Sequence, residues 1–207
     1  MNISIIGCGW MGEPLALELL KNGALIKGTT RSVAKKRRLA AAGIETYLLD
    51  IEDKNIDEKN LSPLFQAEIF FVNIPPGRKN EDVEKDYPKR IEILLKNIVK
   101  QAHLLEGKKP WVIFASSSGV YGTQDCLLRE TTPCHPERAG ARAIYSAEEL
   151  LSKYAPKIDV TILRFAGLVG GNRVAGRFTT GKKDLNSGYT PVNLVHLQDC
   201  ISVVKTL

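Results

Sequence analysis

Hydrophobic and polar positions along the chain alternate between short apolar runs and longer segments with apolar residues at helical spacing. Ile3–Ile6 is an apolar run that ends at glycines, and Glu13–Asn22 carries Leu15, Leu19 and Leu20 at helical spacing. The first pattern is typical of a buried strand and the second of a helix with one apolar face. The chain therefore begins with a strand followed directly by a helix.

The same alternation continues along the rest of the chain and predicts a parallel sheet. Strands are predicted at Ala24–Thr29, Ile44–Leu49, Ala67–Ile74, Trp111–Ser116, Val160–Phe165 and Val192–Val195, and helices at Val33–Ala42, Tyr87–Leu105, Ser146–Tyr154 and Leu197–Val204. Alternating strands and helices indicate βαβ units with helices on both faces, and right-handed crossovers make the sheet doubly wound. We therefore predict an α/β fold with one domain over residues 1–207. Glycine-rich, basic residues 167–190 are predicted to form a small loop region on the substrate side.

The composition limits the function classes. The net charge is +6, and part of it lies in Arg31–Arg38, which indicates either a solvated helix face or a contact for an anionic ligand. No nucleic-acid recognition motif accompanies this charge. Four cysteines form neither a CxxC pair nor a metal-ligand cluster, as is typical of a reducing cytosol. No signal peptide or membrane span stands out. We expect a cytoplasmic protein without bound metal, nucleic acid or membrane.

The glycine motif Gly7-Cys8-Gly9-Trp10-Met11-Gly12 lies between the first strand and the first helix. This context is typical of a dinucleotide site. Gly7 allows the tight turn, Gly9 lets a pyrophosphate approach the backbone, and Gly12 lets the helix pack close to the strand. Trp10 and Met11 lie within the same candidate site, where Trp10 either stacks over the cofactor or caps the helix. The alternative is a glycine-rich turn without a ligand.

The end of the second strand indicates which dinucleotide is bound. An NAD site usually has an acidic residue there, which holds the ribose hydroxyls. This chain has Thr29, Thr30, Arg31 and Ser32 instead, with Lys35 nearby. A guanidinium and hydroxyls suit a 2′-phosphate. The sequence therefore favours NADP(H), with NAD(H) as the alternative.

Four later segments carry a family resemblance. NIPPGR (73–78), FASSSGVYG (114–122), ILRFAGLVGGNR (162–173) and VNLVHLQDC (192–200) resemble, in order, motifs of the atypical extended short-chain dehydrogenase/reductase superfamily. These are NAD-dependent epimerase/dehydratase-like proteins, and the resemblance implies an NAD(P)-binding Rossmann fold. The first stretch also resembles β-hydroxyacid dehydrogenases, but their helical second domain has no room in 207 residues.

The resemblance implies a catalytic serine at Ser117. The family also uses a Tyr-x-x-x-Lys pair, in which the lysine lowers the pKa of the tyrosine. Tyr145 is followed four residues later by Glu149, and the alternative register places Gly140 and Ile144 at the two positions. The pair is absent in both registers. A carboxylate close to Tyr145 would raise the pKa of its phenol.

Tyr145 remains the first candidate for the general acid, and its alternative is a packing residue. Tyr121 is a second candidate, which in the family usually shapes the pocket. The resemblance also places Asp50, Pro75 and Ser116 among the cofactor contacts, although Asp50 is equally typical of a turn.

His196 and Asp199 look like an acid/base or metal pair, but the resemblance implies a structural role. Arg138 and Arg142 are candidates for charge near the cofactor. Basic residues at 173, 177, 182 and 183 are expected either to contact an anionic substrate or the cofactor phosphates, or to form a mobile loop.

The sequence thus predicts an NADP(H)-dependent oxidoreductase that acts on a small carbonyl or carbinol, on a sugar-like or nucleotide-linked substrate. Two alternatives stay open. One is a non-catalytic NADP(H)-binding module that senses redox state or acts through a partner, and the other is a β-hydroxyacid-type dehydrogenase. The predicted helices Tyr87–Leu105 and Ser146–Tyr154 are candidates for a homodimer interface.

Overall fold

The computed structural model describes residues 1–207 except 52–60, 78–79, 125, 177–179, 182 and 184–191. Its centre is a six-stranded sheet in the order β3-β2-β1-β4-β5-β6, with all neighbouring strands parallel. The strands are β1 (Asn2–Ile6), β2 (Leu25–Thr30), β3 (Glu45–Leu48), β4 (Ile69–Val72), β5 (Trp111–Ser117) and β6 (Asp159–Phe165). The predicted doubly wound α/β fold is confirmed.

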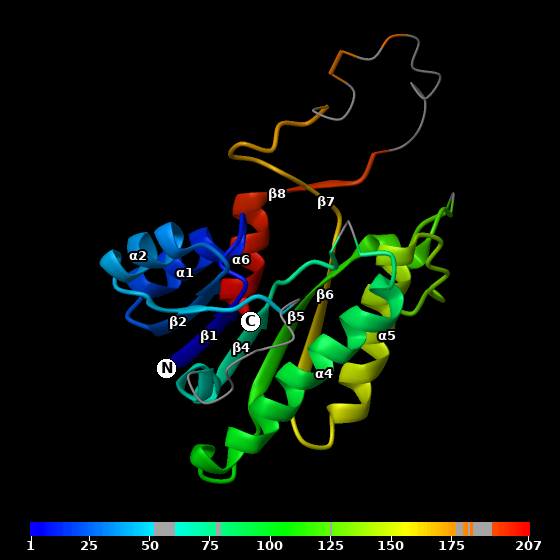
Figure 1. Ribbon diagram of the computed structural model, residues 1–207. Coiled ribbons are helices and arrows are strands. Elements are labelled where there is room, and N and C mark those ends of the chain that lie inside the picture. Colours follow the sequence, from blue (N-terminus) through cyan, green and yellow to red (C-terminus); the bar gives the residue numbers. More distant parts are fainter. Residues whose placement is uncertain (52–60, 78–79, 125, 177–179, 182, 184–191) are drawn as a thin grey trace.

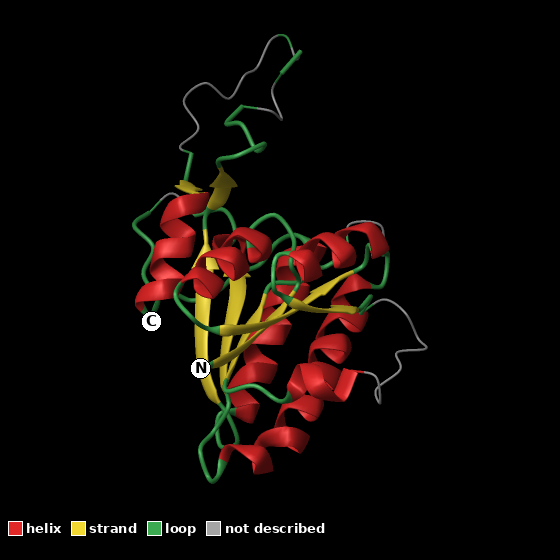
Figure 2. Cartoon of the chain, turned by 90° about the vertical axis from the view of Figure 1, so that its left-hand side faces the viewer, coloured by secondary structure: helices red, strands yellow, loops and turns green. Residues whose placement is uncertain are grey.

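Helices cover both faces of this sheet (Figures 1 and 2). They are α1 (Gly12–Lys21), α2 (Val33–Ala41), α4 (Val83–Gln101), α5 (Ala139–Tyr154) and α6 (Leu197–Thr206). Leu15, Leu39 and Ile201 bring α1, α2 and α6 into the core on one face. Tyr87 and Leu151 bring α4 and α5 into the core on the other. Because both faces are buried, the central strands are apolar almost throughout, which is why the sequence predicted them well.

Two helices begin earlier than predicted. The α4 helix begins at Val83 and includes Pro88, and α5 begins at Ala139 rather than Ser146. The first turns of α5 are rich in alanine and arginine and carry few large apolar residues, so hydrophobic periodicity did not reveal them. The extra turns matter, because they bring α5 to the carboxyl end of β5.

Short 3-10 turns complete the connections between the main elements. They are η1 (Ser62–Phe65), η2 (Ala102–Leu105) and η3 (Ser118–Tyr121). The last of these follows β5 directly, so it lies where a doubly wound sheet binds its ligands.

A second, two-stranded sheet connects β6 to α6. It pairs β7 (Gly167–Val169) in parallel with β8 (Leu194–His196), close to the predicted strand Val192–Val195. The predicted loop region thus contains one strand at its start, and its basic residues 177 and 182 lie outside the described residues. Among the described helices, none is long and apolar enough to cross a membrane.

Candidate functional site

Two of the three glycines in the first loop are required by packing inside the chain. Gly7 has a φ of +107°, and a Cβ built there would lie 2.5 Å from the carbonyl oxygen of Asn73. A Cβ on Gly12 would overlap the carbonyl oxygen of Gly7. The β1–α1 turn and the end of β4 therefore approach too closely for any side chain at these two positions.

Gly9 differs from the other two glycines of the motif. It is exposed, and the nearest atom to a Cβ built there is the Gly7 carbonyl oxygen, at 4.0 Å. Internal packing therefore gives no reason for a glycine at this position. The open space in front of Gly9 adjoins the start of α1, where the positive end of the helix dipole favours an anion. These features fit the diphosphate of a dinucleotide.

Thr29 holds this loop in place, a role that the sequence analysis did not predict. Its hydroxyl accepts a hydrogen bond from the Gly7 N–H at 2.8 Å, and its carbonyl accepts one from the Cys8 N–H at 2.8 Å. Thr29 is buried, with 2% exposure. The signal available in the sequence was a hydroxyl residue near the end of the strand that neighbours the loop.

The other two predicted loop residues have different environments. Met11 is buried in the core, so only its backbone is positioned to contact a ligand. Trp10 is half-buried. The guanidinium of Arg173 lies over its ring, with Cζ 4.2 Å from the ring centroid.

Arg31, Thr30, Ser32 and Asp50 lie together where β2 and β3 end. The Arg31 guanidinium is 3.9 Å from the Asp50 carboxylate, and its side chain is 71% exposed. Such a long, exposed ion pair contributes little stability, so Arg31 can turn toward a phosphate at small cost. Ser32 caps α2, because its hydroxyl accepts a hydrogen bond from the Lys35 N–H. Thr30 in turn accepts one from the Ser32 N–H at 3.2 Å.

Two other residues of the basic run, Lys35 and Arg38, pair with α1. Lys35 lies 2.7 Å from the Glu13 carboxylate, and Arg38 contacts the same group. Burial acts to raise the pKa of Glu13, but the hydrogen bonds from Arg38 and Lys35 outweigh it and lower the pKa below its usual value. Glu13 is therefore an ionised carboxylate whose charge is compensated by α2. Arg31 lies outside this cluster.

The candidate catalytic residues lie at the carboxyl end of β5 and on α5. The Ser117 hydroxyl accepts a hydrogen bond from the Gly119 N–H at 3.1 Å, which leaves its own proton available as a donor. A Cβ on Gly119 would lie 4.0 Å from the Ala141 Cβ, so η3 packs against the start of α5. Tyr145 lies one turn after Ala141 on the same face of the helix, and therefore on the side of Ser117.

The environment of Tyr145 keeps its phenol protonated. Burial raises the pKa of Tyr145, and the charge of Glu149 raises it further. The phenol thus suits a proton donor rather than a base at neutral pH. Ile144, at the family's lysine position in the second register, packs against the core under α4 and α5.

A buried polar network supports this edge of the sheet. Ser116 donates a hydrogen bond to Glu148, which is 3% exposed and pairs with Arg164 at 2.7 Å. Arg164 also donates to the Tyr121 hydroxyl at 2.8 Å and lies over its ring. Four residues from β5, α5, β6 and η3 are thereby fixed together. Ser116 and Tyr121, both predicted site residues, are held by this network.

Glu148 and Arg164 were not predicted as site residues. Each interrupts an apolar pattern, since Arg164 ends the run VTIL in β6 and Glu148 follows the buried Ala143 and Ala147 on α5. An apolar strand and an apolar helix face that each carry one charge of opposite sign indicate a buried ion pair, and this signal was available.

Two of the remaining candidates, Arg142 and His196, have structural partners. Arg142 forms two hydrogen bonds with the Glu84 carboxylate, which joins α5 to α4. His196 caps α6 by accepting from the Gln198 N–H at 3.3 Å. Pro75 is exposed, and its neighbour Pro76 lies 3.7 Å from a Cβ built on Gly140. Within the described residues, no cluster of three or more metal-ligating side chains occurs.

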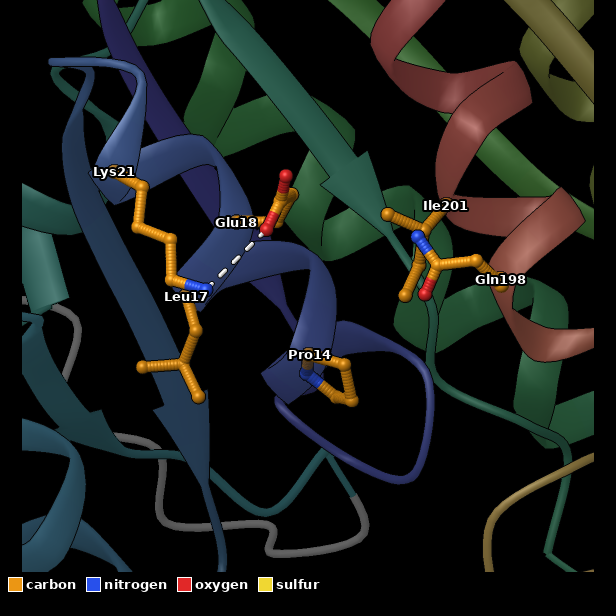
Figure 3. Close-up of a pocket in the computed structure, with 6 residues that line it drawn as sticks. All are labelled: Pro14, Leu17, Glu18, Lys21, Gln198 and Ile201. Atoms are coloured by element: carbon orange, nitrogen blue, oxygen red, sulfur yellow. Dashed lines mark ion pairs between the residues drawn. The ribbon is translucent and has the colours of Figure 1, made fainter.

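A groove of about 220 Å³ lies between α1 and α6 (Figure 3). Its lining residues are Pro14, Leu17, Glu18, Lys21, Gln198 and Ile201. Glu18 pairs with Lys21 in this groove and with Lys205 on α6 at 2.9 Å. The groove therefore belongs to the packing of α6 on α1.

Comparison with known proteins agrees with this geometry. A model of the NAD dependent epimerase/dehydratase family matches residues 3–188. Protein YeeZ of Escherichia coli (strain K12) is 35% identical over 208 residues, which cover 99% of this chain and 72% of YeeZ.

Solved structures share the fold at low identity. UDP-glucose 4-epimerase from Thermotoga maritima, with UDP-glucose, has a TM-score of 0.76 at 22% identity, over 98% of this chain and 71% of that one. UDP-glucuronic acid 4-epimerase from Bacillus cereus, in complex with UDP-glucuronic acid and NAD, has a TM-score of 0.72 at 19% identity, over 100% and 73%. A functionally unknown conserved protein from Silicibacter pomeroyi has a TM-score of 0.71 at 22% identity, and the chain covers 66% of it.

Because the loop glycines have different surroundings, the same substitution should destabilise the fold at one position and hardly affect it at the other. Gly12→Ala should lower the free energy of unfolding by about 1–3 kcal/mol, because the new methyl group overlaps the Gly7 carbonyl. Gly9→Ala should change it by less than about 0.5 kcal/mol, because the methyl group enters open space. Urea denaturation of both variants measures the difference. A Gly9→Ala protein as unstable as Gly12→Ala would contradict this account of the loop.

Removing one member of the buried Glu148–Arg164 pair should destabilise the fold strongly, whereas replacing both members by apolar residues should destabilise it much less. Glu148→Ala should destabilise the fold by about 3–5 kcal/mol, because it leaves the Arg164 charge without its carboxylate. Changing both residues, as in Glu148→Leu with Arg164→Met, should recover much of that loss. Thermal and urea unfolding of Glu148→Leu, of Arg164→Met and of the double variant form the required cycle. Additive losses would show that the pair is not coupled.

Proposed function

The chain belongs to the NAD dependent epimerase/dehydratase family, and we propose that it is an oxidoreductase that uses NADP(H) on a carbonyl or carbinol substrate. The observation that carries the proposal is the loop geometry. Gly7 and Gly12 are fixed by packing, whereas Gly9 faces open space at the start of α1. A glycine that packing does not require is explained by a ligand that approaches the backbone.

The preference for NADP(H) rests on the end of β2. The position that holds an acidic residue in NAD sites is here Thr30-Arg31-Ser32. Arg31 is mostly exposed and only loosely paired with Asp50, and it precedes the capped start of α2. A 2′-phosphate at this point would gain a charge-assisted hydrogen bond and the favourable end of the helix dipole.

The proposed catalytic side chains at the end of β5 and on α5 can both donate a proton. The bound cofactor would supply or accept a hydride. Ser117 retains a hydroxyl proton that it can donate to the substrate oxygen, and Tyr145 is kept in the protonated form by burial and by Glu149. The two side chains together suit the reduction of a carbonyl, in which an oxygen gains negative charge and then a proton. Sugar-linked or nucleotide-linked carbonyls are the proposed substrate class.

A non-catalytic NADP(H)-binding module is the second candidate. The raised pKa of Tyr145 and the apolar residue Ile144 favour it, because the cation that activates tyrosine in the family is missing there. Steady oxidation of NADPH by a panel of carbonyl compounds would establish the enzyme. Tight binding of NADPH without turnover across the panel would support the module instead.

The cofactor proposal is tested by calorimetric titration with NADPH and NADH. We expect NADPH to bind more tightly, and Arg31→Ala to weaken it more than about tenfold, equivalent to about 1.4 kcal/mol. NADH, which has no 2′-phosphate, should be affected less than about twofold. Arg37→Ala, which removes the same charge from an exposed position on α2, is the matched control.

Three results would overturn parts of this proposal. If the unaltered protein binds neither nucleotide, the glycine loop is only a turn and the oxidoreductase proposal fails. If it binds NADH as tightly as NADPH, the preference for NADP(H) is wrong. If Arg31→Ala and Arg37→Ala weaken NADPH binding equally, Arg31 acts only through the overall charge.

A further inference from the structure

Tyr121 is held in one position through its hydroxyl, its ring and its backbone. It is the last residue of η3, directly after β5, and it is 6% exposed. Its phenol oxygen accepts a hydrogen bond from Nη1 of Arg164 at 2.8 Å, and the guanidinium lies over its ring, with Cζ 4.9 Å from the centroid. Its backbone carbonyl accepts from the Gln124 side chain at 2.6 Å. The direction of the phenol is therefore set by the chain itself.

Arg164 is in turn oriented by Glu148. Its Nε donates to the two carboxylate oxygens of Glu148 at 3.1 and 3.2 Å, and its Nη2 donates to one of them at 2.7 Å. This arrangement uses the Nε and Nη2 side of the guanidinium for the carboxylate and directs Nη1 at Tyr121. The carboxylate balances the charge of Arg164, so the pair acts on Tyr121 by directing a hydrogen bond and not by supplying a net charge.

The phenol proton of Tyr121 has a different status from its oxygen. A phenol both donates and accepts hydrogen bonds, whereas a guanidinium can only donate, so the contact with Arg164 uses the oxygen and leaves the proton available. Within the part of the chain that the structure describes, no residue accepts this proton. Buried donors are nearly always paired. A buried phenol proton without an acceptor, at the ligand edge of a doubly wound sheet, therefore points to an acceptor on a ligand.

Tyr145 lies near the same guanidinium but is not held by it. Burial raises the pKa of Tyr145, and Glu149 raises it further, whereas the charge of Arg164 acts in the opposite direction. Among the described residues, the Tyr145 hydroxyl has no hydrogen-bond partner. The two phenols near Arg164 thus differ, because the network directs Tyr121 and leaves Tyr145 undirected.

We propose that Tyr121 is a catalytic residue that donates a hydrogen bond to the substrate oxygen, and that Glu148 and Arg164 are positioning residues that aim it. The inference rests on the proposed reduction of a carbonyl by NADPH. In that reaction the carbonyl carbon gains a hydride, and the π electron pair of the C=O bond moves to the oxygen. A donor that is already oriented stabilises the charge that develops there. Tyr121 keeps its proton, and the proton that ends on the product comes from Tyr145.

Tyr121→Phe removes only the hydroxyl and leaves the buried ion pair intact. We expect kcat to fall about hundredfold, as for the loss of one oriented donor, while KM changes by less than about threefold. The measurement is the oxidation of NADPH with methylglyoxal, diacetyl, isatin and phenanthrenequinone as carbonyl probes, combined with calorimetric titration of NADPH. Tyr154→Phe, which removes a phenol hydroxyl from the last residue of α5, is the matched control and should leave kcat unchanged.

The positioning role is tested in the double variant of Glu148→Leu and Arg164→Met. This variant keeps an apolar interior but removes the donor that directs Tyr121, so kcat should fall about tenfold or more with little change in KM. Adding Tyr121→Phe to it should lower kcat by less than about threefold further, because the residues act as a unit. Circular dichroism and the thermal midpoint show whether the double variant is folded, and Tyr121→Phe alone decides the donor role if it is not.

The outcomes separate this inference from the proposed function. A large loss of kcat in Tyr121→Phe with unchanged NADPH affinity, and a much smaller loss from the same change in the double variant, support it. Unchanged kcat in Tyr121→Phe overturns it, and the reduction then depends on Ser117 and Tyr145 alone. Weaker NADPH binding in Tyr121→Phe also overturns it, because the contact would then be to the cofactor.

Two further outcomes are equally clear. If Tyr121→Phe lowers kcat by the same factor with and without the buried pair, Glu148 and Arg164 are not positioning residues. If the unaltered protein binds NADPH but reduces none of the carbonyl probes, the oxidoreductase proposal fails in favour of the non-catalytic module, and this inference fails with it.

Discussion

The close approach of three backbone segments at the end of β1 is the constraint on which the candidate site depends. Gly7 lies against the Asn73 carbonyl, and Gly12 lies against the Gly7 carbonyl, so β1, β4 and the start of α1 meet without intervening side chains. Thr29 fixes the loop from β2 by accepting a hydrogen bond from the Gly7 N–H. This contact directs the start of α1 toward the open space at Gly9. The positions of Arg31 and Trp10 relative to that space follow from it.

A second constraint fixes the other half of the site. The Glu148–Arg164 pair joins α5 to β6 and holds Ser116 and Tyr121 through hydrogen bonds. A buried ion pair of this kind adds little net stability compared with apolar packing, but it strongly disfavours arrangements that separate its members. Electrostatic interactions therefore maintain the geometry at the carboxyl end of β5. Close steric packing maintains the geometry at the carboxyl end of β1.

The sequence predicted the fold well because the central strands are buried on both faces and appear as unbroken apolar runs. It placed β1 and β6 to within one residue at each end. It placed the start of α5 incorrectly, because Ala139–Ile144 carries few large apolar residues. The buried pair was missed because Glu148 and Arg164 come together only when β6 pairs with β5 and α5 packs on the sheet. Similarly, the three glycines of the motif look alike in sequence, and only their packing shows that Gly9 differs from Gly7 and Gly12.

The most direct test of the central claim is to follow backbone amide resonances of isotopically labelled protein while NADPH is added. The account predicts that the largest shifts fall on residues 7–12 at the glycine loop and on residues 30–33 at the start of α2. Shifts confined to the groove between α1 and α6, around Gln198 and Ile201, would contradict it. An unchanged spectrum at high NADPH concentration would contradict it as well.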